Sequence, residues 1–165
     1  MTALAIAVAI VAASIALVTD VRTRRIPNWL TASVLLAGLL VNVLANGADG
    51  LVSALTGAAL GFVLLIPFYA MRAMGAGDVK LLAALGAVLG PQVLLGAAAG
   101  GALVGGLMSL IILARRGRLS LALHQLFVMH TIPTPSGAKA PYAVAIASGV
   151  YLAVLRQVAA LPSFG

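Results

Sequence analysis

Residues 51–71 read LVSALTGAALGFVLLIPFYAM, and no side chain in this stretch is charged. A helix needs about 20 largely apolar residues to cross a hydrocarbon core of roughly 30 Å, so this stretch is long enough to span a bilayer. Similar apolar stretches fill most of the chain, which predicts an all-α membrane protein, a bundle of about six transmembrane helices forming a single domain over residues 1–165. The other five stretches are residues 2–19, 29–44, 79–89, 93–114 and 141–155.

The composition agrees with a membrane location. Hydrophobic residues make up 63% of the chain and charged residues 8%, against about 25% charged residues in soluble domains. The net charge of +7 would suggest nucleic-acid binding in a soluble protein. Here Lys and Arg lie in the short gaps between apolar stretches, a pattern that orients helices in a bilayer. We therefore expect the lipid bilayer, and no nucleic acid, as a partner.

The positive charges also predict an orientation. The first stretch has no basic region ahead of it, so we expect a retained helix with its N-terminus outside rather than a cleaved signal peptide. Alternating the spans from there leaves only Arg156 near the outer face and places the other nine of the ten basic residues on the cytoplasmic side of the inner membrane. These nine are Arg22, Arg24, Arg25, Arg72, Lys80, Arg115, Arg116, Arg118 and Lys139.

The chain has only three acidic residues, Asp20, Asp49 and Asp78. An ionisable residue beside a membrane span is by default a functional candidate. Asp49 is better explained by the turn Asn-Gly-Ala-Asp-Gly at residues 46–50, where aspartate bonds the local backbone. Asp20 ends the first stretch and Asp78 precedes the fourth, so the alternation of spans places both at the cytoplasmic face.

Two carboxylates at one level can perform acid-base hydrolysis. Like charges a few ångströms apart do not both ionise easily, so one carboxyl stays protonated while the other activates water. Each residue alone also has a structural explanation. Asp78 could be the N-cap of a helix starting at Val79, and Asp20 a boundary residue beside Arg22 and Arg24.

Three motifs distinguish these alternatives: DVRTRRIPN at residues 20–28, GAGDVKL at 75–81 and APYAVAIA at 140–147. With these motifs the chain resembles the prepilin peptidases, a family of Gly-x-Gly-Asp membrane aspartic proteases. The resemblance implies that Asp20 and Asp78 are catalytic. It also implies that the substrates are type IV prepilins or pseudopilins, cut at the cytoplasmic membrane boundary behind a basic leader. The compact length is similar to the Tad (Flp pilus) type without a methyltransferase domain, so N-methylation is not expected.

Five further residues are candidates for binding substrate or shaping the site: Gly75, Gly77, Lys80, Pro141 and Tyr142. Each has a simpler alternative. The glycines can serve helix packing, Lys80 can be a topology charge, and Pro141 can occupy the first turn of the last helix. We expect no cofactor and no metal site, because cysteine is absent and His124 and His130 lack the i, i+4 spacing of metal-binding pairs.

Two other kinds of protein fit parts of the pattern. A small transporter, channel subunit or pilus-assembly scaffold would also have glycine-rich spans, but ion pathways favour acids near the bilayer midplane. A protease closer to presenilin shares Gly-x-Gly-Asp, but its Pro-Ala-Leu motif is absent here. The oligomeric state has no signature in the sequence.

Overall fold

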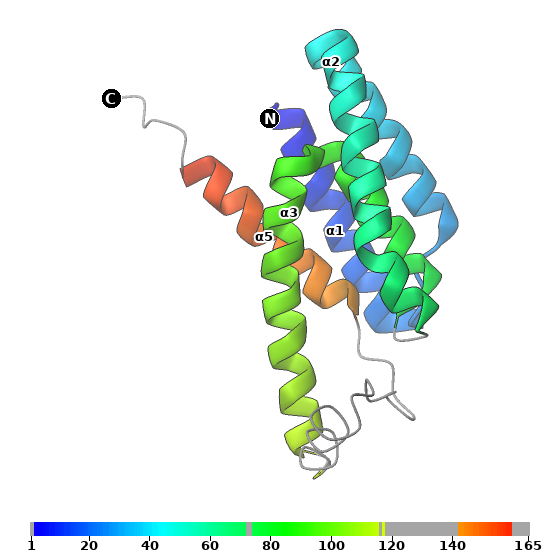
Figure 1. Ribbon diagram of the computed structural model, residues 1–165, viewed down its shortest axis with the longest axis vertical. Helices are drawn as coiled ribbons and strands as arrows, with labels where there is room; N and C mark the ends of the chain where they lie inside the picture. The colour runs from blue at the N-terminus through cyan, green and yellow to red at the C-terminus, as the bar shows by residue number, and fades with distance from the viewer. Residues whose placement is uncertain (1, 72–73, 116, 118–141, 160–165) are drawn as a thin grey trace.

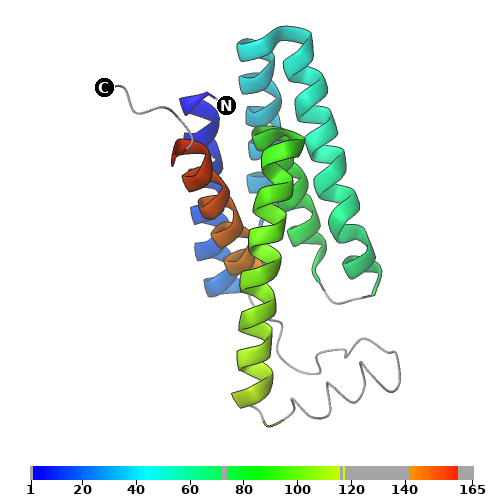
Figure 2. The same cartoon turned by 60° about the vertical axis from the view of Figure 1, so that its left-hand side comes forward.

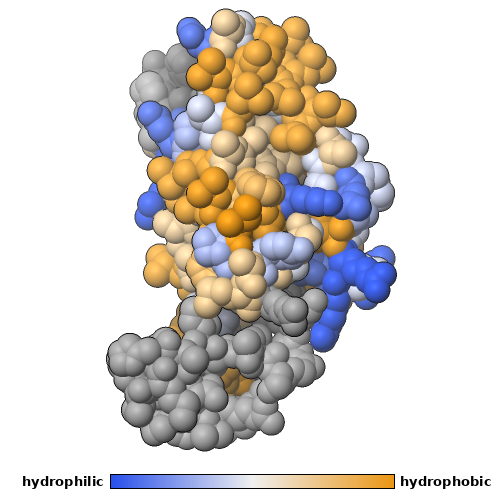
Figure 3. All heavy atoms as spheres, turned by 45° about the vertical axis from the view of Figure 1, so that its right-hand side comes forward, coloured by the Kyte–Doolittle hydropathy of each residue, from blue (hydrophilic) through white to orange (hydrophobic). Residues whose placement is uncertain are grey.

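The computed structural model describes residues 2–71, 74–115, 117 and 142–159. They form four helices: α1 (Ala3–Thr23), α2 (Asn28–Ala70), α3 (Ala76–Arg115) and α5 (Tyr142–Ala159). All four are long and apolar enough to cross a membrane, so the protein is an all-α integral membrane protein. The space-filling view shows a broad hydrophobic surface broken by separate hydrophilic patches (Figure 3).

Helices α2 and α3 both double back on themselves (Figures 1 and 2). In α2 the single non-helical residue is Gly47, with φ 58° and ψ −131°. In α3 it is Gly90, with φ 74° and ψ 168°, followed by Pro91. Positive φ is readily available only to glycine, and proline suits the start of the helical arm that follows. We call the arms of α2 residues 28–46 and 48–70, and those of α3 residues 76–89 and 91–115.

The expected count of six spanning helices is not confirmed, because the structure has four candidate spans. The turn expected over residues 46–50 is reduced to Gly47, so helical geometry runs almost unbroken through the reversal. The fourth stretch begins at Ala76 instead of Val79, and the gap between the fourth and fifth stretches contains a reversal at Gly90. Residues 115–140, which separate the last two apolar stretches, lie mostly outside the described residues.

Small residues bring the helices into close contact. Gly57 and Gly61 on α2 lie directly against α3 backbone, where a Cβ on Gly57 would collide with the carbonyl oxygen of Gly86. The same arrangement joins α3 to α5, because a Cβ on Gly149 would collide with the carbonyl oxygen of Ala97. Such contacts suit a bilayer, where helices associate through close packing instead of water exclusion.

Polar contacts inside the bundle are few. Asn42 on α2 donates hydrogen bonds of 2.8 and 3.2 Å to the carbonyl oxygens of Ala87 and Val88, just before the break at Gly90. These carbonyls are near a helix end, where intrahelical donors run out. On the other side, the hydroxyls of Ser14 on α1 and Tyr151 on α5 lie 2.8 Å apart. Each contact holds two helices in register.

Candidate active site

Asp20 lies in the last turn of α1, and its side chain is 9% exposed. The helix ends because Arg24 adopts a left-handed conformation, φ 51°, and donates its N–H to the Asp20 carbonyl oxygen at 2.8 Å. The Asp20 carboxylate accepts a hydrogen bond of 3.2 Å from the backbone N–H of Ala143, in the first turn of α5. Asp20 is therefore a buried link between two helices, unlike the boundary residue considered as an alternative.

Asp78 lies in the first turn of α3, and its side chain is 8% exposed. Its carboxylate accepts a hydrogen bond of 3.1 Å from the N–H of Gly75, and its own N–H donates to the Gly75 carbonyl oxygen at 3.1 Å. Because the helix begins at Ala76, Gly75 is the N-cap and Asp78 the third helical residue, so the contact is the carboxylate half of a capping box. Asp78 is thus not the N-cap itself.

The start of α5 connects the two carboxylates. Ala143 donates its N–H to Asp20, and its neighbour Tyr142 lines one cavity together with Met74 and Leu82, which lie four residues before and after Asp78 in the chain. Both aspartates therefore lie near the first turn of α5, although they belong to different helices far apart in the sequence. We call this end of the bundle, formed by the end of α1 and the starts of α3 and α5, the aspartate end.

The two glycines of the Gly-x-Gly-Asp motif have different neighbours. A Cβ on Gly77 would lie 3.1 Å from the Cβ of Ile26, in the connection between α1 and α2. A Cβ on Gly75 would lie 3.3 Å from a carboxylate oxygen of Asp78. Gly77 thus lets the start of α3 approach the segment that follows Asp20, and Gly75 leaves room beside the second carboxylate.

The remaining candidates are placed differently. The ammonium group of Lys80 donates a hydrogen bond of 3.0 Å to the side-chain oxygen of Asn28, which ties the starts of α3 and α2 together at the surface. Tyr142 is half-buried at the start of α5. Pro141, His124 and His130 lie outside the described residues. The sequence analysis missed Ile26 and the backbone N–H of Ala143. The helix start predicted beside Pro141 could have indicated this N–H group.

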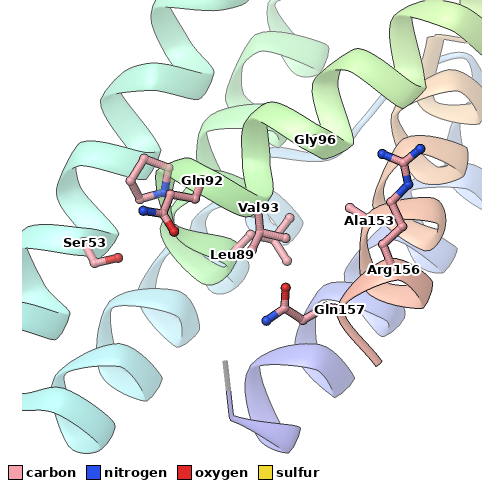
Figure 4. Close-up of a pocket in the computed structure, with 10 residues that line it drawn as sticks. Ser53, Leu89, Gln92, Val93, Gly96, Ala153, Arg156 and Gln157 are labelled. Atoms are coloured by element: carbon pink, nitrogen blue, oxygen red, sulfur yellow. The ribbon is translucent and has the colours of Figure 1, made fainter. Parts of the chain in front are cut away.

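The other end of the bundle lacks this chemistry. Asp49 is exposed beside the reversal at Gly47. A cavity of about 520 Å³ lies near Gly90, between α2, α3 and the last turns of α5 (Figure 4). Ser53, Gln92, Arg156 and Gln157 supply its polar side chains, and no carboxylate or histidine of the described chain lines it. Within the described ranges, no group of three metal-ligating side chains occurs.

Two buried carboxylates near one helix N-terminus can perform acid-base chemistry on a peptide bond. Fixed backbone donors orient each carboxylate, and burial strengthens the hydrogen bonds that they make. The N-terminal dipole of α5 favours negative charge at this place.

Comparison with known proteins gives a consistent picture. The model of the type IV leader peptidase family matches residues 7–110, which include both aspartates. A prepilin leader peptidase/N-methyltransferase of Burkholderia pseudomallei (strain K96243) is 41% identical over 111 residues, covering 61% of this chain and 34% of the relative. Proteins with the same name are 42% identical over 82 residues in Klebsiella pneumoniae, covering 46% and 36%, and 44% identical over 82 residues in Dickeya chrysanthemi, covering 46% and 29%.

The chain therefore spans about a third of the length of these curated relatives. No solved structure is significantly similar to it. The match to the family model covers more than half of the residues and confirms the resemblance first indicated by the three motifs. The chain belongs to the type IV leader peptidase family.

Proposed function

We propose that this chain is a membrane-embedded aspartic endopeptidase that removes the basic leader of type IV prepilins, with Asp20 and Asp78 as its catalytic pair. The observation that carries the proposal is that two buried carboxylates lie at one end of the bundle, where the first turn of α5 binds Asp20 and shares a cavity with residues on both sides of Asp78. The family match and the names of the relatives support a prepilin as the substrate. Within that class of substrate, we propose a pilin of the Tad (Flp) type.

In the proposed reaction, the ionised carboxylate accepts a proton from water as the water attacks the carbonyl carbon of the scissile bond. The protonated carboxyl donates its proton to the developing oxyanion, which gives a diol. As the C–N bond then breaks, the carboxyl that took the proton from water passes it to the leaving nitrogen, and the other carboxyl recovers a proton from a diol hydroxyl. Neither residue is assigned as the acid. The N–H groups of Ala143 and Gly75 hold the carboxylates in orientation throughout.

We also propose that the aspartate end faces the cytoplasm and that each arm of α2 and α3 crosses the membrane, giving six crossings. The basic residues Arg22, Arg24, Arg25 and Lys80 lie close to the two aspartates in the chain, whereas Arg156 lies in the last turn of α5. This distribution follows the positive-inside rule. Cleavage would then occur where the leader meets the cytoplasmic surface.

A cleavage assay tests the proposal. The purified chain in liposomes is incubated with a Flp-type prepilin that carries its leader, with and without a chelator. We expect the leader to be removed equally in both, since the proposed mechanism uses only carboxyl groups. The absence of cleavage would favour a scaffold or transporter, and a loss in chelator that zinc restores would contradict the aspartic mechanism.

A further inference from the structure

The cavity near Gly90 lies at the opposite end of the first arm of α3 from Asp78, and the proposed reaction does not use it. Its volume is about 520 Å³, and α2, α3 and α5 all contribute to its walls (Figure 4). Gly90 lies beside Gly57 of α2, because a Cβ on Gly57 would lie 3.1 Å from the carbonyl carbon of Gly90. The reversal of α2 at Gly47 is about 15 Å further along that helix, at 1.5 Å per residue. The cavity is therefore recessed below the tip of α2, which rises past the reversal of α3 (Figure 2).

Hydrogen-bonding side chains from three helices line this recess. Ser53 on α2 has a hydroxyl, Gln92 on α3 and Gln157 on α5 have carboxamides, and Arg156 on α5 has a guanidinium group. No carboxylate of the described chain is among the lining residues. A carboxamide can both donate to and accept from a hydroxyl group, whereas an ammonium group would find no ionised acceptor here. The lining thus favours an anion that also carries hydroxyl groups.

Arg156 is a cation with no acidic partner at the level of the cavity. The protein has three acidic side chains. Asp20 and Asp78 lie at the aspartate end, and Asp49 lies beside the tip of α2. The positive-inside rule also leaves Arg156 as the only basic residue expected at this end of the bundle. A charged side chain in a membrane bundle commonly marks a functional site, so we looked for an ionic partner outside the protein.

The backbone adds to the positive potential of the cavity. The second arm of α3 begins at Pro91, and its first turn lines the cavity. The N-terminus of a helix carries a partial positive charge and N–H groups without intrahelical acceptors, and both favour anions. Gly96 of the same arm also lines the cavity, and a Cβ there would meet no heavy atom within 4 Å among the described residues. The cavity therefore combines open space with several donors.

We propose that this cavity binds a phosphodiester anion whose headgroup carries hydroxyl groups, as in phosphatidylglycerol. The planar guanidinium group of Arg156 pairs with the phosphate oxygens, and the carboxamides of Gln92 and Gln157 bond the hydroxyls. The same chemistry is offered by a lipid of the leaflet at this end and by a soluble glycerol phosphate, so the test must separate the two sources. The inference does not rest on the proposed proteolysis.

The test measures binding to the full chain, purified in detergent and freed of lipid, by native mass spectrometry. The probes are phosphatidylglycerol, phosphatidylethanolamine, phosphatidylcholine and soluble glycerophosphoglycerol, which is the first headgroup without acyl chains. We expect one tightly held phosphatidylglycerol per chain and weaker binding of the two lipids that carry a cationic nitrogen. Retention of phosphatidylglycerol alone identifies a lipid site. Equally tight binding of glycerophosphoglycerol identifies a site for a soluble phosphate.

Arg156→Gln and Arg115→Gln form a matched pair of variants. Each removes one positive charge from the last turn of a helix, but Arg115 lies at the far end of the second arm of α3. Hydrogen bonds to a charged group change affinity by about tenfold or more, so Arg156→Gln should weaken phosphatidylglycerol binding by that factor. Arg115→Gln should bind like wild type. Gly96→Leu, which fills the cavity and removes no charge, should also weaken binding.

Three results would overturn the inference. The first is equal binding of all three lipids by the wild type. The second is an equal loss in Arg156→Gln and Arg115→Gln, which would show attraction to net charge instead of a site. If Gly96→Leu does not fold, Gln157→Ala replaces it, and an unchanged preference for phosphatidylglycerol over phosphatidylethanolamine in that variant is the third. All of these measurements remain valid in a chain that cleaves no prepilin, so failure of the proposed function is a separate outcome.

Discussion

Asp20 and Asp78 are equally buried at one end of the bundle, yet they are held in different ways. Asp78 bonds the N–H of Gly75, three residues earlier in its own helix start. Asp20 bonds the N–H of Ala143, on the last helix of the bundle. The hydrogen bond of Asp78 to Gly75 therefore forms within a short local motif, whereas that of Asp20 to Ala143 requires the docking of α5. The pair is complete only when the whole bundle has formed.

The helix dipoles also act differently on the charges of the two aspartates. A carboxylate is stabilised at the N-terminus of a helix and destabilised at the C-terminus. Asp78 lies in the first turn of α3, so its own helix favours its charge. Asp20 lies in the last turn of α1, and the N-terminus of α5 offsets the unfavourable dipole of α1. The energetic role of α5 is thus greater for Asp20.

The largest expected effect is a loss of prepilin cleavage that is equally severe for either aspartate. Asp20→Asn and Asp78→Asn should each lower the rate of prepilin cleavage by about a thousandfold or more, because an amide keeps the shape and cannot exchange the proton. Asp49→Asn, at the exposed reversal of α2, is the matched control and should cleave at the wild-type rate. A dyad variant close to wild type, or an inactive Asp49→Asn, would refute the assignment of the pair.

Alanine variants should separate the residues by stability. Asp20→Ala leaves the buried N–H of Ala143 without its acceptor, which costs about 1–3 kcal/mol. Asp78→Ala removes one capping contact, worth about 1 kcal/mol. Hydrogen exchange should therefore accelerate in the first turn of α5 for Asp20→Ala and at the start of α3 for Asp78→Ala. Identical exchange patterns in the two variants would show that local and remote anchoring do not differ.

The two glycines of the Gly-x-Gly-Asp motif should also differ in their effect on the cleavage rate. Gly77→Ala places a methyl 3.1 Å from the β-branched Ile26, so the segment after Asp20 must shift by a few tenths of an ångström. Displacements of about 1 Å can cost a hundredfold in rate, so we expect about a tenfold loss. Gly75→Ala meets only an oxygen of Asp78 at 3.3 Å and should lose less. Measured kcat values would reverse this order if Gly75 were the more constrained position.

The smallest effect is expected at Lys80. Its side chain is exposed and bonds Asn28, so Lys80→Gln should change the cleavage rate less than about threefold, as expected for an exposed polar contact. Asn28→Ala removes the same contact and should behave alike. A large loss in Lys80→Gln with none in Asn28→Ala would indicate that Lys80 itself contacts the substrate.

The sequence predicted the level of both aspartates, because alternating apolar stretches determine at which end of a bundle each connection lies. It also predicted a break between the stretches 79–89 and 93–114, where α3 reverses at Gly90. It did not predict that α2 and α3 stay almost fully helical through their reversals, since one glycine with positive φ can replace the whole turn expected at 46–50. The partner of Asp20 was missed because a backbone N–H has no side-chain signature.

The central claim is that the two carboxylates act as one unit despite their different anchors. The most direct test measures residual prepilin cleavage by Asp20→Asn, Asp78→Asn and the double variant at high enzyme concentration, in the same membranes. Residues that act together give strongly non-additive losses, so the double variant should be about as slow as either single variant. A double variant whose loss equals the product of the two single losses would show two independent residues and contradict the catalytic pair.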